Sequence, residues 1–236
     1  MAPELILIAD REPKMLSLLR QVLSGAGYGV TAAAKGAQAV QIAATEQLTL
    51  VLLDAGLAGE VDGFEAARRI REFSDVPIVL LSYADGSEEA LRAFTVGADD
   101  FITKPFDPRI LLARVRAILK RCQGRVPAPA EIVCDDLVID PAARRVTRGG
   151  AEIPLTDTEY HLLLELARHR DRVLVHDQLL DAVWGTEYRS EIGYLRSYIH
   201  ILRRKLEDNP SQPRLIISRP GIGYMLMTVQ TKDPGT

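Results

Sequence analysis

Short apolar runs alternate with amphipathic segments throughout the first half of the chain. The runs cover residues 5–9, 27–33, 48–53, 77–81 and 99–103. After each run, apolar residues recur at helical spacing, which predicts helices over residues 13–25, 38–45, 63–73, 87–96 and 107–121. Strands that alternate with helices form a parallel sheet that is covered on both faces. Residues 1–121 are therefore predicted to be an α/β domain with a doubly wound (βα)5 sheet.

The alternation ends after residue 121. Residues 122–130 contain two prolines and one glycine and predict a semi-extended linker. Thr156 and Glu159 have the spacing of a capping box at a helix start. The remaining pattern predicts an α+β winged helix-turn-helix domain over residues 131–230 and a tail over residues 231–236. Its predicted strands are 131–139, 143–147 and 151–155, its helices are 157–168, 176–184 and 192–207, and its terminal hairpin joins 215–218 to 224–227.

Composition limits where such a protein can act. No stretch reaches the roughly 18 apolar residues that a membrane span needs, and the first residues do not resemble a signal peptide. Cys122 and Cys134 are too few for a disulfide framework and lack zinc spacing. We therefore expect a cytoplasmic protein without a membrane partner. Because the net charge is −3, only a local excess of positive charge can indicate nucleic-acid binding.

Charged residues follow three of the predicted strands. Asp10 and Arg11 follow the first, Asp54 follows the third, and Lys104 follows the fifth. The carboxyl ends of strands in an open parallel sheet form the ligand crevice, so these side chains should meet there. A small α/β phosphotransferase with Asp54 as nucleophile is one interpretation. It lacks a second acid near Asp54 for acid–base work, and it leaves the C-terminal domain unexplained.

The last predicted helix divides into an apolar face and a polar face. The apolar positions are Leu195, Tyr198, Ile199, Leu202 and Leu206, and the polar positions are Arg196, Ser197, His200, Arg203 and Arg204. Residues 196–219 contain six basic and two acidic residues, a local charge of +4. Such a charge is typical of a surface that contacts the DNA backbone. We expect Arg196 and His200 to contact base edges and Arg203, Arg204 and Lys205 to contact phosphates. An adaptor that binds protein instead of DNA is the alternative.

Over nearly its whole length the chain resembles the OmpR/PhoB family of two-component response regulators. The matching segments are residues 6–10, 52–54, 76–82, 97–106, 155–160, 183–185, 202–206 and 221–224. Residues 194–198 and 206–210 are most similar to regulators of the Kdp potassium-transport operon. The resemblance implies a transcription regulator, not an enzyme, that forms homodimers and binds double-stranded promoter DNA. It also implies contacts with RNA polymerase from loop 185–193 and a sensor histidine kinase as phosphoryl donor.

The resemblance also assigns roles in the N-terminal crevice. Asp54 corresponds to the phosphoacceptor, Ser82 to the switch hydroxyl and Lys104 to the phosphoryl-binding cation, while Asp10, Asp54 and Gly56 correspond to the Mg²⁺ ligands. Arg11 stands where the family has a second acid, and a guanidinium cannot ligate a metal. Asp10, Arg11, Asp54 and Lys104 have no net charge together, so we expect weakened Mg²⁺-dependent phosphorylation. A bidentate Arg11–Asp54 pair and a phosphorylation-independent regulator both remain open.

Other positions depart from the family pattern. Asp99, Asp100, Arg114 and Arg121 correspond to its dimer ion pairs, but Ile110 stands where the family often has Glu. Loop 55–62 is one residue longer than usual, and Tyr83 replaces a small residue after Ser82. In the wing, Arg219 precedes Pro220, which takes the place of the family's arginine before the glycine.

Overall fold

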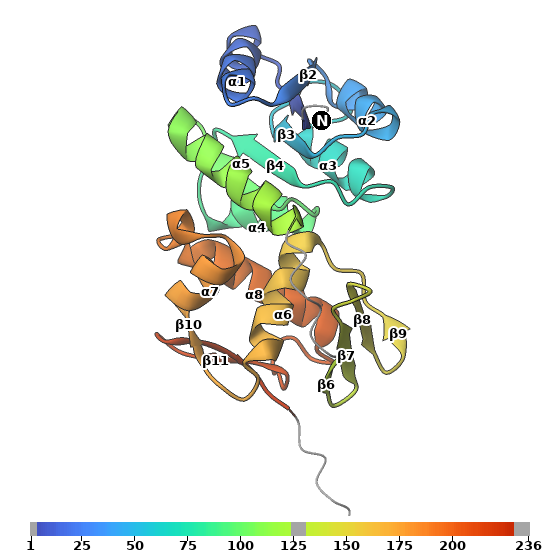
Figure 1. Cartoon of the computed structure of the whole chain (residues 1–236), viewed down its shortest axis with the longest axis vertical. Helices are drawn as coiled ribbons and strands as arrows, with labels where there is room; N and C mark the ends of the chain where they lie inside the picture. The colour runs from blue at the N-terminus through green and yellow to red at the C-terminus, as the bar shows by residue number, and fades with distance from the viewer. Residues whose placement is uncertain (1–3, 124–130, 229–236) are drawn as a thin grey trace, which may run out of the picture. The chain divides into compact units, whose positions relative to one another are not determined.

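The computed structural model describes residues 4–123 and 131–228. The chain divides into two compact units, Met1–Gln123 and Gly124–Thr236 (Figure 1). The predicted tail and residues 124–130 of the predicted linker lie outside the described residues. The first two residues of that predicted linker belong to the last helix of the N-terminal unit, which ends at Gln123.

The N-terminal unit is a five-stranded parallel sheet with the strand order β2-β1-β3-β4-β5. This strand order confirms the prediction of a doubly wound sheet. The prediction succeeded because strands that are buried on both faces appear in a sequence as apolar runs. The elements are β1 (Leu5–Ala9), α1 (Pro13–Gly25), β2 (Gly29–Ala33), α2 (Gly36–Thr45), β3 (Leu50–Asp54), α3 (Gly63–Arg71), β4 (Ile78–Ser82), α4 (Ser87–Thr95), β5 (Asp100–Thr103) and α5 (Pro108–Gln123).

Helices cover both faces of this sheet. The α1 and α5 side chains pack on the face that carries Ile6, Ile8 and Leu52, and α2 and α3 lie on the opposite side (Figure 1). Strands β1, β3 and β4 are buried almost throughout. The carboxyl ends of these central strands therefore lie on a rigid frame, and the loops that follow them are free to carry chemistry.

The described part of the C-terminal unit has two antiparallel sheets and three α-helices. One sheet contains β6 (Ile132–Cys134), β7 (Leu137–Asp140), β8 (Arg145–Arg148) and β9 (Ala151–Glu152) in sequential order. The helices are α6 (Asp157–Arg168), α7 (His176–Val183) and α8 (Ile192–Leu206), with a 3₁₀ turn at Thr186–Tyr188. The other sheet has the order β10-β12-β11, with β10 (Leu174–Val175), β11 (Ile216–Arg219) and β12 (Gly223–Leu226). The winged-helix prediction is confirmed.

Two strand predictions need correction. The segment 131–139 is not one strand, because the chain reverses at Asp135, whose φ of 57° is left-handed, and β6 then pairs with β7. The sequence pattern also did not indicate β10, whose two residues pair with β12. A side chain at Gly223 would collide with the carbonyl oxygen of Leu174, so glycine permits this close pairing.

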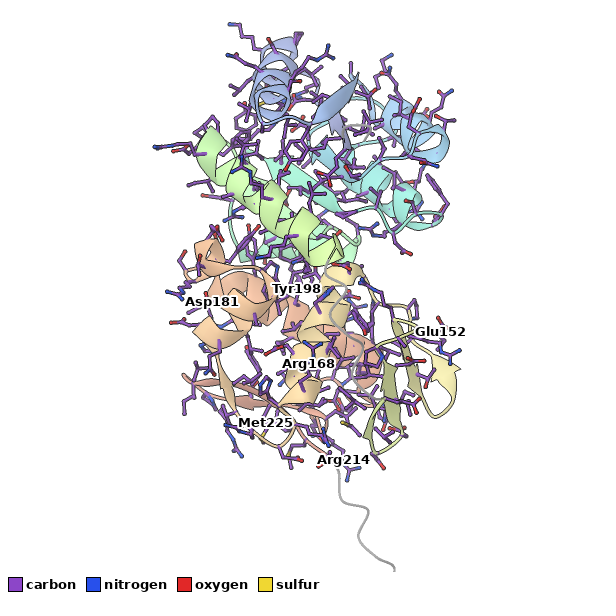
Figure 2. All side chains as sticks on the ribbon, viewed as in Figure 1. Glu152, Arg168, Asp181, Tyr198, Arg214 and Met225 are labelled. Carbon is purple, nitrogen blue, oxygen red and sulfur yellow. The ribbon has the colours of Figure 1, made fainter. Side chains whose placement is uncertain are left out.

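The helix starts and the core of this unit follow the sequence pattern. The Thr156–Glu159 capping box is present, with the Thr156 N–H donating to Glu159 Oε2 at 2.9 Å. Tyr198 on α8 and Met225 on β12, both labelled in Figure 2, are buried. The apolar face of α8 is thus anchored in the core, and its opposite face remains at the surface.

Candidate functional site

A buried lysine bridges two carboxylates at the carboxyl edge of the parallel sheet. Lys104 Nζ donates to Asp10 Oδ2 at 2.6 Å and to Asp54 Oδ1 at 2.8 Å. All three residues are at most 4% exposed. The ends of β1, β3 and β5 bring these residues together, as the position of the crevice in a doubly wound sheet predicts.

The two hydrogen bonds keep Lys104 charged. Burial acts to lower the pKa of its ammonium group, but the bonds to Asp10 and Asp54 outweigh burial and raise the pKa above its ordinary value. Asp10 Oδ1 accepts the backbone N–H of Glu12 at 2.8 Å, so both of its oxygens are engaged. Within the described residues, Oδ2 of Asp54 accepts no hydrogen bond.

Arg11 borders the free oxygen of Asp54 without pairing with it. The Arg11 residue is exposed, and in the described ranges 4–123 and 131–228 it forms no ion pair. A methyl group placed on Gly56 would lie 3.6 Å from Asp54 Oδ2 and 3.9 Å from the guanidinium carbon of Arg11. The oxygen and the guanidinium therefore both lie within van der Waals reach of the volume that a side chain at position 56 would occupy. Lys104, rather than Arg11, holds the Asp54 carboxylate in place.

Tyr83 partly covers this crevice. Its ring centroid lies 5.1 Å from Lys104 Nζ, and its hydroxyl donates to Glu12 Oε1 at 3.3 Å. The Glu12 carboxylate, a candidate for a replacement metal ligand, thus accepts a hydrogen bond from Tyr83. Ser82 is buried, and its Oγ accepts the N–H of Ala84 at 3.1 Å. The sequence showed that Tyr83 is unusual, but gave no signal for its contact with a residue 71 positions away.

The loop with the extra residue is fixed at its end. The Asp62 side chain caps α3 by accepting the N–H of Glu65 at 2.8 Å. Gly63 lies so close to the carbonyl oxygen of Asp54 that a side chain there would collide with it. The end of the loop is therefore anchored beside Asp54.

The donor set does not fit Mg²⁺. This ion requires six oxygen ligands in near-octahedral geometry. Three of the four carboxylate oxygens of Asp10 and Asp54 already accept hydrogen bonds, and a guanidinium borders the fourth. Among the described residues, no three His, Cys, Asp or Glu side chains are grouped as a metal site. The two carboxylates and two cations also cancel in charge, so the crevice lacks electrostatic attraction for a dication.

The residues assigned to dimer ion pairs have partners within the N-terminal unit. Asp99 Oδ2 accepts Arg71 Nη2 at 2.7 Å and the Ile78 N–H at 3.0 Å. Asp100 Oδ1 accepts the Phe101 N–H at 2.7 Å and Arg114 Nη1 at 3.3 Å. Arg121 lies in the last turn of α5. Both Asp99 and Asp100 are fully buried, and Asp99 links the start of β4 to the segment before β5, whereas Asp100 links β5 to α5.

A row of polar side chains covers the exposed face of α8. Arg196, His200 and Arg204 are exposed and four residues apart, hence on one side of the helix. Arg219 is exposed at the end of β11, next to the turn with Gly221 at a φ of 73°. These four residues form the basic face of the C-terminal unit.

Three other residues predicted at this surface lie elsewhere or have partners within the protein. The prediction that Ser197 lies on the exposed face is wrong: it is 7% exposed, and its hydroxyl donates to the Gly193 carbonyl at 3.1 Å. Arg203 donates from Nε and Nη2 to the Ile216 carbonyl at 3.0 and 2.6 Å, and burial lowers the pKa of its guanidinium. Lys205 donates to Glu159 Oε2 at 2.6 Å. Arg203 and Lys205 thus fasten α8 to β11 and to the start of α6.

Comparison with known proteins accounts for both units. Residues 6–116 match the family described as "Response regulator receiver domain", and residues 150–226 match "Transcriptional regulatory protein, C terminal". A transcriptional regulatory protein KdpE of Mycobacterium tuberculosis is 38% identical over 221 residues, covering 93% of this chain and 97% of the relative. Within the described residues, no helix has the length and apolar character that a membrane span requires.

Solved structures give the same result. The response regulator DrrB of Thermotoga maritima, described as an OmpR/PhoB homolog, is 30% identical with a TM-score of 0.52, over 95% of this chain and 99% of that one. A mutant of the protein RitR is 29% identical with a TM-score of 0.71, over 94% and 98% of the two chains.

Proposed function

This chain belongs to the OmpR/PhoB family of two-component response regulators, and on that basis we propose how its two units act. The N-terminal unit is the receiver domain and the C-terminal unit is the DNA-binding transcriptional regulatory domain. We propose that the protein controls transcription in the cytoplasm by binding duplex promoter DNA through the basic face, and that the receiver sets dimerisation. The family consists of transcription regulators rather than enzymes.

The observation that supports DNA binding is the exposure of Arg196, His200 and Arg204 along one side of α8, whose opposite side is buried. An α-helix fits the major groove, where arginine can bind guanine edges with two hydrogen bonds. We assign Arg196 and His200 to base edges and Arg204 and Arg219 to phosphates. Arg203 and Lys205 act by positioning α8, since their donors are occupied by β11 and α6.

We expect Arg204→Ala to weaken binding to all sequences and to reduce the slope of log affinity against log salt by about 1, because one phosphate contact is lost. Arg196→Ala should instead relax preference at one base pair, at a cost of about 1–3 kcal/mol. Fluorescence anisotropy with the chain's own promoter at several salt concentrations measures both effects. Arg20→Ala, an exposed arginine on α1, is the matched control. Salt-insensitive binding by the wild-type protein would instead identify a protein-binding adaptor.

The family implies dimerisation and a sensor kinase as partners, and a dimer with two-fold symmetry would match two half-sites on DNA. We place the dimer surface on α4, β5 and α5, where Ile110 is 50% exposed. Of the four residues assigned to dimer ion pairs, Asp99, Asp100 and Arg114 are buried, so they support this surface from within the unit. Contacts with RNA polymerase are assigned to loop 185–193. Receiver domains generally bind Mg²⁺ for phosphorylation, and we propose that this metal-dependent route is weak here because the crevice does not fit the ion.

A further inference from the structure

We propose that Arg11 takes the place of both the second acid and the divalent metal, so that Asp54 accepts a phosphoryl group without a metal ion. The inference rests on the proposed receiver role of the N-terminal unit. It places the phosphoryl group beside Gly56, where Arg11 would bind the phosphoryl oxygens. An acid at position 11 could ligate a metal ion but could not bind these oxygens.

The charges of the crevice support this exchange. In a receiver with two acids, the second acid and a bound Mg²⁺ together contribute a charge of +1, and Arg11 contributes the same charge alone. Phosphorylation replaces the Asp54 carboxylate by an acyl phosphate of charge about −2. With Asp10, Arg11 and Lys104 present, the phosphorylated crevice then carries a charge of about −1. This equals the charge of a phosphorylated two-acid site that holds its metal, so no additional cation is needed.

The geometry places the groups where such a reaction needs them. Lys104 holds Oδ1 of Asp54 at 2.8 Å, and in the described part of the chain nothing donates a hydrogen bond to Oδ2. The Arg11 guanidinium carbon and Asp54 Oδ2 lie 3.9 and 3.6 Å from the point that a methyl group on Gly56 would occupy, and glycine leaves that point unfilled. A guanidinium presents a planar fork of donors that matches two phosphoryl oxygens. Arg11 has no other ion-pair partner among residues 4–123 and 131–228, so its donors are available.

The contact between Tyr83 and Glu12 favours the same conclusion. If Glu12 turned into the crevice, it would supply the missing acid and restore attraction for a dication. Its Oε1 instead accepts the Tyr83 hydroxyl at 3.3 Å, and its N–H is bound to Asp10 Oδ1. The crevice therefore keeps two carboxylates and two cations.

The transfer step is balanced without a metal. Oδ2 of Asp54 attacks the phosphorus of a phosphoimidazole or an acyl phosphate and forms a new P–O bond. The bond from phosphorus to the leaving group breaks, and its electron pair stays on the leaving group. An acyl phosphate releases a carboxylate anion, and a phosphoimidazole releases an imidazole that takes a proton from solvent. Arg11 and Lys104 stabilise the charge on the phosphoryl oxygens.

The test measures labelling of the full-length chain by acetyl phosphate, followed by intact-mass spectrometry, in Mg²⁺ and in EDTA. We expect the wild-type protein to be labelled equally fast in both, and Asp54→Asn to remove the label. Arg11→Met should slow labelling at least about tenfold, because a cation about 4 Å from a phosphoryl group contributes more than one decade at an effective dielectric constant of ~20. Arg11→Asp should make labelling dependent on Mg²⁺. Arg20→Met, which changes an exposed arginine outside the crevice, should label like the wild type.

Labelling of the wild-type protein only in Mg²⁺ would overturn the inference, and this comparison needs no variant that must fold. Equal labelling of Arg11→Met and the wild type in EDTA would overturn it as well. If only Arg11→Asp is labelled, Arg11 blocks the site instead of serving it. None of these labelling results bears on promoter binding, which the anisotropy measurement tests separately.

Discussion

Arg71→Met is expected to lower the free energy of unfolding of the N-terminal unit by about 3–5 kcal/mol, the usual cost of removing one partner of a buried ion pair. Arg71 Nη2 donates to Asp99 Oδ2 at 2.7 Å, and Asp99 is fully buried. Nε donates to the Gly97 carbonyl at 3.0 Å, and Nη1 to the carbonyls of Ser74 and Val76 at 2.9 and 2.6 Å. One guanidinium thus provides hydrogen bonds to acceptors in the segments that precede β4 and β5.

Hydrogen exchange of β4 and β5 amides, measured by mass spectrometry in the full-length chain, separates this unit from the other one. Arg68→Met is the matched control on the same helix. The Arg68 side chain is 52% exposed and pairs with Glu65 and Glu72, so its removal should cost less than about 1 kcal/mol. Arg71→Lys should be intermediate, because an ammonium cannot reproduce the planar fork. Equal protection in Arg71→Met and Arg68→Met would show that Asp99 does not depend on Arg71.

The parallel-sheet unit could be predicted almost completely from sequence. Strands buried on both faces appear as apolar runs, and their helices show one apolar stripe, so each element has a local signal. The convergence of Asp10, Asp54 and Lys104 followed from topology alone, because all three lie at or just beyond the carboxyl ends of strands. The position of Arg11 beside Asp54, without an ion pair, could not be predicted. Lys104 and Arg11 could each pair with the Asp54 carboxylate, and the sequence does not show which of the two does so.

The DNA-binding unit shows where periodicity stops being sufficient. Helical spacing separated the buried Leu195 from the exposed Arg196, but it placed Ser197 on the wrong side because 197 lies at the border of the two faces. Arg203 appears as a free cation in sequence, although it binds the Ile216 carbonyl 13 residues later in the chain. Long side chains at a helix edge can reach solvent or a neighbouring strand, and only the fold decides between the two.

Glu207→Ala is expected to destabilise the C-terminal unit by at least about 3 kcal/mol, because three backbone N–H groups lose their acceptor and each loss costs about 1 kcal/mol or more. Oε1 of Glu207 accepts the N–H groups of Leu215 and Ile216 at 3.0 and 2.8 Å. Oε2 accepts the N–H of Arg214, which Figure 2 labels, at 2.9 Å. Glu207, which is 9% exposed, therefore ties the end of α8 to the start of β11 and fixes the β11–β12 hairpin relative to the exposed side of α8.

Fluorescence of Trp184, the single tryptophan of the chain, reports unfolding of the C-terminal unit in urea because Trp184 is buried there against Tyr198. Asp208→Ala is the matched control, since the Asp208 side chain is 82% exposed and forms a surface ion pair with Arg148. Loss of this pair should cost less than about 1 kcal/mol. Glu207→Gln keeps one acceptor oxygen and should lie between the two. If Glu207→Ala unfolds at the same urea concentration as Asp208→Ala, water replaces the carboxylate at these N–H groups. The pairing of β11 with β12 would then hold β11 in place.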